Sequence, residues 1–290
     1  MDDQHQIGSG QLGVAINAQG AELCSLRHAG VEYLWQAGPA WPRHAPVLFP
    51  IVGRLPDDLL RHDGASHRMT QHGFARDRRF EWVERSPTSC RLALADDDET
   101  RAAYPFRFRL EAEYRVTEAA LTIELAVCNV GKGVLPASVG LHPAFAWPLP
   151  GSTDKASHTL VFEQAEADPI RSVGDGLLQA ASRPSPVVGE TLALRESLFD
   201  ADALIFDRLG SRSVRYAAPG CSTVEVGWRN CPYLGVWSKA GGDFLCIEPW
   251  HGISTPQGFD ADFAAKPGLM LIAPGKRQVV GVSISVLAPG

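Results

Sequence analysis

The stretch "FRFRLEAEYRV", from Phe106 to Val116, alternates apolar and charged side chains along its whole length. Its even-numbered positions are Phe, Phe, Leu, Ala, Tyr and Val, and its odd-numbered positions are Arg or Glu. A period of two places successive side chains on opposite faces of a strand. The stretch therefore predicts a β-strand with one buried face and one face in water.

The next segment, "LTIELAVCNV" from Leu121 to Val130, repeats this alternation with Leu121, Ile123, Leu125 and Val127 on the inward face. Only "TEAA" separates the two runs, and so short a polar connection is typical of a hairpin. We expect the two strands to pair antiparallel.

Strand-like runs bounded by Gly, Pro, Asp, Asn or Ser continue through most of the chain. Helical periodicity is confined to "LPDDLLRHDG" (55–64) and parts of 192–199, which are too short to cover a parallel sheet. The fold class predicted is all-β: a large antiparallel β-sandwich with few short helices. Because such folds often exceed 200 residues as one unit, residues 1–290 are expected to form a single domain.

Composition excludes several classes of function. The 290 residues are 45% hydrophobic and 21% charged, as in an ordinary globular protein, and the net charge is -6. Basic residues form no long run, so no nucleic-acid partner is expected. The polar start and the lack of an apolar stretch of about eighteen residues predict a protein with no membrane association and a cytoplasmic location.

Cysteine and histidine patterns favour neither a disulfide framework nor a metal site. Six cysteines are scattered without a C-x-x-C pair, which predicts reduced and mostly buried thiols. Nine histidines show no H-E-x-x-H motif and no Cys/His cluster, so no metal is expected. The absence of G-x-S-x-G disfavours a serine hydrolase of the α/β type.

Four segments combine a titratable side chain with glycine, proline or aromatic neighbours. They are "FPIVGRL" with Arg54, "QHGFARDRRF" with His72, "GLHPAF" with His142 and "CIEPWHG" with Glu248. Each residue alone has an ordinary structural explanation as a turn anchor, a loop histidine or a strand end. Together they are more informative, because histidine and glutamate are natural acid and base groups near neutral pH.

Local sequence indicates how two of these side chains are held. Pro143 and Phe145 are expected to fix His142 toward a cleft, with the phenyl ring packed beneath it. Pro249 is expected to end the strand ladder directly after Glu248. Such an environment suits a carboxylate in a partly dry pocket with a raised pKa.

The segments "HGFAR", "GLHPAF" and "EPWHG", in this order and spacing, resemble the aldose 1-epimerase (mutarotase) family over nearly the whole chain. The resemblance implies a single-domain β-supersandwich, no metal, no organic cofactor and a small-molecule sugar as partner. The chain departs from the family's usual pattern at Ala144, where a second aromatic is common, and at His251.

By this resemblance Glu248 is the general base and His142 the general acid. His72 would hydrogen-bond near the ring oxygen, and Arg54 would bind sugar hydroxyls or steady charge near the acid. A sugar-binding aspartate is placed at Asp202.

Two assignments stay open among neighbouring residues. Asp200 and Asp207 flank the same predicted strand as Asp202 and are alternatives to it. Trp237 and Trp250 are candidates either for core packing or for a flat apolar platform under a sugar ring, and Trp237 is the one we assign to substrate.

An aldose 1-epimerase acting on a free hexose is the favoured function. Hexose 6-phosphates are an alternative substrate class, because "HGFAR" is shared with a branch that acts on them and Arg76, Arg78 or Arg79 could bind phosphate. A carbohydrate-binding protein without turnover is a second alternative. Polysaccharide processing is disfavoured, since it needs a long groove and usually further domains.

Overall fold

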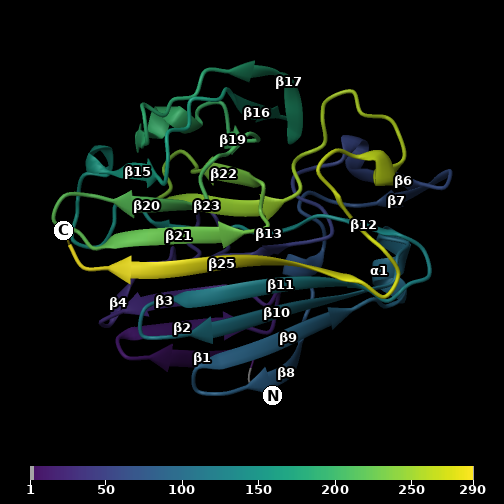
Figure 1. The fold of residues 1–290 in the computed structure, drawn as a ribbon, viewed down its shortest axis with the longest axis horizontal. Helices are drawn as coiled ribbons and strands as arrows, with labels where there is room; N and C mark the ends of the chain where they lie inside the picture. The colour runs from purple at the N-terminus through teal and green to yellow at the C-terminus, as the bar shows by residue number, and fades with distance from the viewer. Residues whose placement is uncertain (1–2, 290) are drawn as a thin grey trace.

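Antiparallel β-sheet is the main secondary structure of the molecule, whose computed structural model describes residues 3–289. Two large sheets form the main layers, and smaller sheets flank them (Figure 1). Pairings between neighbouring strands of the two large sheets are antiparallel. The predicted all-β antiparallel sandwich is confirmed.

The larger sheet has nine strands and runs across the centre of Figure 1. Its order is β18 (Thr191–Ala193), β15 (Thr159–Phe162), β20 (Ser213–Ala217), β21 (Thr223–Arg229), β25 (Arg277–Leu287), β11 (Leu121–Asn129), β10 (Phe108–Val116), β9 (Ser89–Ala95) and β8 (Glu81–Arg85).

The second large sheet positions His142, which follows β13, and Glu248, which lies in β23. Its order is β17 (Leu177–Arg183), β16 (Ile170–Gly174), β19 (Leu204–Phe206), β22 (Tyr233–Trp237), β23 (Phe244–His251), β13 (Val139–Leu141) and β5 (Val47–Leu48), with β14 (Ala144–Ala146) also paired to β23.

Smaller elements complete the described chain. The remaining strands are β1 (Gln4–Ser9), β2 (Leu12–Asn17), β3 (Leu23–His28) and β4 (Val31–Glu32) in one sheet, the pair β6 (Leu59–His62) and β7 (Ala65–Arg68), and the pair β12 (Leu135–Ala137) and β24 (Met270–Ile272). One short α-helix, α1 (Asp98–Ala103), is joined by the 3-10 turns η1 (Pro56–Asp58), η2 (Ala75–Asp77), η3 (Lys155–Ser157), η4 (Glu196–Phe199) and η5 (Phe263–Ala265).

The predicted hairpin is confirmed as β10 and β11, which pair from Phe108 opposite Asn129 to Val116 opposite Leu121. The strand begins two residues later than the alternating pattern does. Its apolar positions are buried as expected: Phe108, Leu110, Ala112, Tyr114 and Val116. Because the apolar side chains all lie on one face of the strand, that face packs against the core and the other face stays in water.

The expected helical segments form less helix than their patterns suggested. In 55–64 only the turn η1 forms, and the chain then enters the β6–β7 hairpin. In 192–199 the turn η4 follows the end of β18.

Helix α1 was not predicted. A capping box forms it: Asp97 accepts a hydrogen bond from the Thr100 backbone N–H, and the Thr100 hydroxyl accepts one from the Asp97 N–H.

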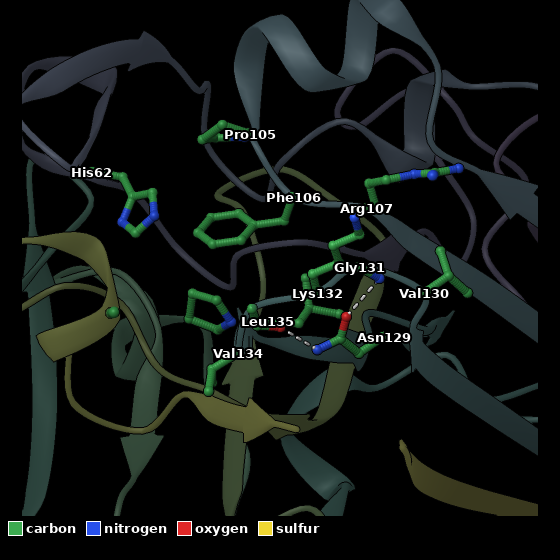
Figure 2. Close-up of a pocket in the computed structure, with 13 residues that line it drawn as sticks. His62, Pro105, Phe106, Arg107, Asn129, Val130, Gly131, Lys132, Val134 and Leu135 are labelled. Carbon is green, nitrogen blue, oxygen red and sulfur yellow. Dashed lines mark hydrogen bonds between the residues drawn. The ribbon is translucent and has the colours of Figure 1, made fainter. Parts of the chain in front are cut away.

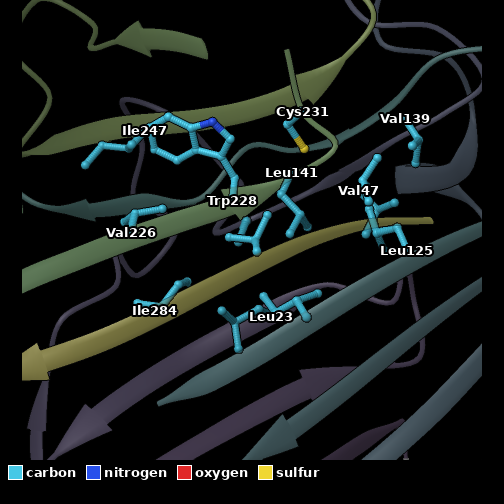
Figure 3. Close-up of a cluster of buried hydrophobic side chains, with 14 of the residues drawn as sticks. Leu23, Val47, Leu125, Val139, Leu141, Val226, Trp228, Cys231, Ile247 and Ile284 are labelled. Carbon is cyan, nitrogen blue, oxygen red and sulfur yellow. The ribbon is translucent and has the colours of Figure 1, made fainter. Parts of the chain in front are cut away.

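A continuous cluster of buried apolar side chains lies between the sheets and extends from Ile7 to Val286. Figure 3 shows Val226 and Ile284 of the nine-stranded sheet in the same buried layer as Leu141 and Ile247 of the eight-stranded sheet. The single domain expected for residues 1–290 stays a prediction. No helix of the described residues is long and apolar enough to span a membrane.

Candidate active site

An imidazole from mid-chain and a carboxylate from the C-terminal part of the chain meet on the eight-stranded sheet. His142 follows β13, and its Nε2 lies 3.1 Å from Oε2 of Glu248 in β23. Only 7% of His142 and 2% of Glu248 are exposed. The two residues are 106 positions apart in sequence, and the antiparallel pairing of β13 with β23 brings them together.

Glu248 lies inside its strand and not at the strand's end. It is opposite Gly235 of β22, and β23 continues through Pro249 to His251, so the expectation that Pro249 ends the ladder is wrong. Pro249 lies where the partner of β23 on one side changes from β14 to β13. A proline is tolerated at such an interruption, because no regular ladder bond is lost there.

Tryptophan rings surround the imidazole. The Trp41 ring stacks on His142 with centroids 4.9 Å apart, and the Trp237 ring meets it edge-on at 5.8 Å. Phe145, expected beneath the imidazole, instead belongs to the main core cluster. The reason is the alternation of β14, which turns Ala144 toward Trp41 and Trp237 and Phe145 to the other face.

His72 approaches the same imidazole from another segment, with ring centroids 5.6 Å apart. Its backbone has a left-handed φ of 65°, and its N–H donates to the Gly53 carbonyl at 2.8 Å. The Gly53 N–H donates in return to Nδ1 of His72 at 3.2 Å. Because Nδ1 accepts a hydrogen bond, the neutral ring carries its proton on Nε2.

These groups line a cavity of about 290 Å³. Of the residues assigned from the sequence, the cavity is lined by His72, His142, Asp202, Trp237 and Glu248. Small-molecule sites typically enclose about 300–1,000 Å³, so this cavity matches a ligand as small as one sugar ring.

Comparison with known proteins identifies the family of this chain. The family model described as "Aldose 1-epimerase" matches residues 3–258. The chain belongs to the aldose 1-epimerase family.

Relatives of this family member include the chromosomal protein LacX of Lactococcus lactis subsp. lactis, 31% identical over 297 residues, with 95% of this chain and 97% of LacX covered. Among solved structures, a galactose mutarotase related enzyme from Lactobacillus acidophilus is 32% identical, with a TM-score of 0.91 and coverage of 98% and 97%. A galactose mutarotase-like protein from Lactobacillus casei ATCC 334 is 26% identical, with a TM-score of 0.90 and coverage of 98% and 99%. The resemblance drawn from the motifs is thereby confirmed at the level of family and fold.

Burial shifts the pKa values of His142 and Glu248. Loss of water lowers the pKa of His142 to about 3. Burial raises the pKa of Glu248 well above its usual range, and the Asp202 carboxylate raises it further. Burial also lowers the pKa of His72, with the nearby His142 ring adding to the effect. Burial therefore favours the neutral tautomer of the pair, in which one proton lies between the carboxyl oxygen and the imidazole nitrogen.

The three candidate aspartates occupy different places. Asp202 has a left-handed φ of 66° and lines the cavity. Asp207 pairs with Arg171 at 3.4 Å, and Asp200 is an exposed residue at the end of η4.

Arg54 lies outside the cavity lining. Its guanidinium is bound by Asp58, with Nε 2.7 Å from Oδ1, and its side chain is 40% exposed beside Gly176. The (i, i+4) ion pair explains why this arginine turns away from the imidazole.

Among the three arginines of the "HGFARDRRF" segment, Arg76 lines the cavity. Its Nη2 donates to the Gln71 carbonyl at 2.6 Å, and its buried Nε has no hydrogen-bond partner in the described chain. Arg78 instead pairs with Asp97 and Glu99, and Arg79 with Asp3.

Several cavity residues were not assigned from the sequence, chiefly Trp41, Gln71 and Ser254. Trp41 precedes Pro42 in "GPAWPRH", a rigid aromatic segment that resembles the other four in composition and could have been singled out on the same grounds. Gln71 and Ser254 carry no such signal.

A larger cavity of about 650 Å³ lies elsewhere, between His62, Phe106, Lys132 and the 129–136 segment (Figure 2). Its Asn129 side chain is satisfied internally, because its Nδ2 donates to the carbonyls of Gly133 and Ile272. Among the described residues its lining includes His62 but no carboxylate side chain, whereas His142 and Glu248 both line the smaller cavity, which is therefore the candidate active site.

Tertiary structure assembles two groups of metal-type ligands that sequence spacing did not reveal. His142, Cys246 and Glu248 form one group, and His62, Asp63 and Asp262 form the other. In the second group Asp262 already accepts bonds from His62 and from backbone N–H groups, which gives it a structural role.

Proposed function

We propose that this protein is a cofactor-independent aldose 1-epimerase that interconverts the α and β anomers of a hexose. The observation that carries the proposal is the contact of 3.1 Å between His142 Nε2 and Glu248 Oε2 on the wall of a cavity of about 290 Å³. An acid and a base so close together can both reach the anomeric carbon's two oxygens, each within hydrogen-bond distance.

Ring opening needs two proton transfers at one carbon. Glu248 takes the proton of the C1 hydroxyl while His142 gives a proton to the ring oxygen. The bond from C1 to the ring oxygen breaks, and C1 becomes the aldehyde carbon. Rotation about the C1–C2 bond and the reverse transfers then close the ring on the other face. The pair contains the same number of protons before and after, so no external acid or base is consumed.

The charged tautomer needed at the start is favoured by the substrate itself. Burial by itself disfavours the Glu248 carboxylate and the His142 imidazolium. Sugar hydroxyls that enter supply hydrogen bonds to both charged groups and thereby offset part of that cost.

Other cavity residues would orient the sugar. Asp202 accepts hydrogen bonds from ring hydroxyls, and His72 donates through Nε2, because its Nδ1 is engaged by Gly53. Trp237 and Trp41 provide flat apolar surface for a ring face. Arg54 does not line the cavity, but it lies beside Gly176, which does, and would support the cavity wall from there.

The test is polarimetry of freshly dissolved α-glucose and α-galactose with purified protein. Glu248→Gln and His142→Ala should each lower the accelerated rate about 100- to 10,000-fold, the usual contribution of a positioned acid or base. Glu225→Gln, on the nine-stranded sheet, is the matched control and should keep full activity. Full activity in both site variants refutes the proposal, and sugar binding without any acceleration by the native protein identifies a binding protein instead.

A hexose 6-phosphate is a second candidate substrate, favoured by one specific observation. Arg76 lines the cavity with a buried Nε that makes no hydrogen bond in the described chain and lies 3.7 Å from Oδ2 of Asp77. Burial is the main cause that lowers the pKa of Arg76, and the nearby charge of Arg43 lowers it further. A guanidinium on the cavity wall suits an anionic group, since guanidinium binds phosphate with paired hydrogen bonds.

Exchange NMR of glucose and glucose 6-phosphate distinguishes the two substrate classes. If phosphate is recognised, Arg76→Met slows exchange of glucose 6-phosphate at least about tenfold and leaves glucose unchanged. If the free sugar is the substrate, Arg76→Met slows glucose exchange and the phosphate ester is a poor substrate of the native protein.

We also propose a cytoplasmic location. All six cysteines are free thiols, and most are buried. Reduced thiols of this kind are typical of a reducing compartment.

A further inference from the structure

A thiol that the proposed reaction does not use lies next to its acid and base. Cys246 and Glu248 are two residues apart on β23, and alternation along the strand turns both toward His142. One ligand atom from each of these three side chains lies within 4.8 Å of the other two.

The surroundings of Cys246 are dry and aromatic. The residue is fully buried and packs with Ala144 and Phe244, and the Trp41 and Trp237 rings cover this small cluster. Within the described chain its sulfur makes no hydrogen bond, and burial raises the pKa of its thiol well above the usual value, so a bound ion must displace the thiol proton.

These three ligand types select a particular class of cation. Zn²⁺ binds thiolate sulfur, imidazole nitrogen and carboxylate oxygen at about 2.0–2.3 Å, and many of its sites have three protein ligands and one open position. Mg²⁺ and Ca²⁺ prefer oxygen ligands and are disfavoured. Bringing three atoms that lie within 4.8 Å of one another onto one ion requires movements of about 1 Å.

We propose that Cys246, His142 and Glu248 form a three-ligand site for a thiophilic divalent cation such as Zn²⁺, and that the bound ion inhibits the enzyme. Zn²⁺ bonds to the sulfur, and the thiol proton leaves to solvent, as does any proton on the carboxyl group. The imidazole nitrogen and the carboxylate oxygen are then occupied by the ion. The inhibition rests on the proposed function, whereas the binding does not.

Co²⁺ is the direct probe of the site, because a cobalt–thiolate bond absorbs in the near ultraviolet. Titration of the native protein should give this band at one Co²⁺ per chain, and added Zn²⁺ should remove it. Cys246→Ala should abolish the band and weaken Zn²⁺ binding, measured by calorimetry, at least about tenfold. Cys231→Ala, a second fully buried cysteine in the core cluster, is the matched control and should keep both. An equal band in the Cys246→Ala protein, or none in the native protein, overturns the proposal.

A second variant and an activity assay separate folding and function from metal binding. Cys246→Ser keeps the side-chain size and should lose the band even if Cys246→Ala folds poorly. Zn²⁺ should slow mutarotation by the native protein, and either Cys246 variant should remain active in the presence of the same Zn²⁺. A cobalt–thiolate band in a protein that does not accelerate mutarotation refutes the proposed function alone. If Zn²⁺ leaves mutarotation unchanged and no cobalt–thiolate band appears, the metal site alone is refuted.

Discussion

Gly53 shows how one residue positions a neighbour that lines the cavity. Its N–H and carbonyl both bond His72, and its φ of 72° is in the left-handed region. A Cβ at this position would lie 1.8 Å from the Ser254 hydroxyl oxygen. The close approach of two cavity segments therefore requires glycine here.

Gly53→Ala should reduce both activity and stability. We expect a loss of about 2–4 kcal/mol in the free energy of unfolding, from overpacking and left-handed strain, and a lower mutarotation rate because His72 is displaced. Urea unfolding and polarimetry measure the two effects. Gly64→Ala is the control: it has a φ of 76° but open space around its Cβ, so it should cost about 1–2 kcal/mol and leave the rate unchanged. Equal behaviour of the two variants contradicts this account.

Lys266 is a buried amine with an unusual environment. Only 3% of it is exposed, and its ammonium donates to the Ile253 carbonyl at 2.5 Å. Burial lowers its pKa from 10.5 to about 7. Between these two values the unfolded chain binds a proton that the folded protein does not, so this residue makes stability rise with pH from about 7 to 10.5.

Lys266→Met should remove that dependence. The free energy of unfolding of the native protein, minus that of the variant, should increase with pH by up to about 1.4 kcal/mol per pH unit above pH 7. Urea titrations at pH 7, 8 and 9 measure the difference. Lys239→Met, at an exposed site, should show no such trend relative to the native protein. A flat difference for Lys266→Met refutes the low pKa.

At the level of elements, the stability of helix α1 comes from the hydrogen bonds that cap its first turn and not from its length. Six residues are too few for an independent helix, and none of its interior positions offers a long apolar face. The capping box of Asp97 and Thr100 supplies the hydrogen bonds that the first turn lacks.

Asp97→Ala should therefore destabilise the protein by about 0.5–2 kcal/mol, the usual cost of losing such a cap. Chemical unfolding measures the change. Asp168→Ala, at an exposed position outside any named element, should change stability by no more than about 0.5 kcal/mol. If the two substitutions cost the same, the cap is not what stabilises α1.

For the molecule as a whole, the continuous core predicts cooperative unfolding. The main buried cluster joins strands from β1 to β25 and includes residues of both large sheets, and only two small clusters lie outside it in the described chain. Differential scanning calorimetry should show one transition. Two resolved transitions would contradict the single domain expected for residues 1–290.

The sequence by itself predicted the all-β class, the hairpin of β10 and β11 and the two central catalytic candidates. Alternation along Phe108–Val116 predicted a buried face because burial depends on which side of a strand a residue occupies, a local property. His142 and Glu248 were recognisable because glycine, proline and aromatic residues around each mark backbone held in a special shape.

Tertiary structure alone decided which other side chains reach those two. Arg54 was expected at the site but is turned away by Asp58, while Arg76 lines the cavity. Trp41 and Cys246 join the imidazole from strands and loops far apart in sequence. Such convergence depends on which strands pair and how the sheet curves, and these are non-local choices that no short stretch of sequence encodes.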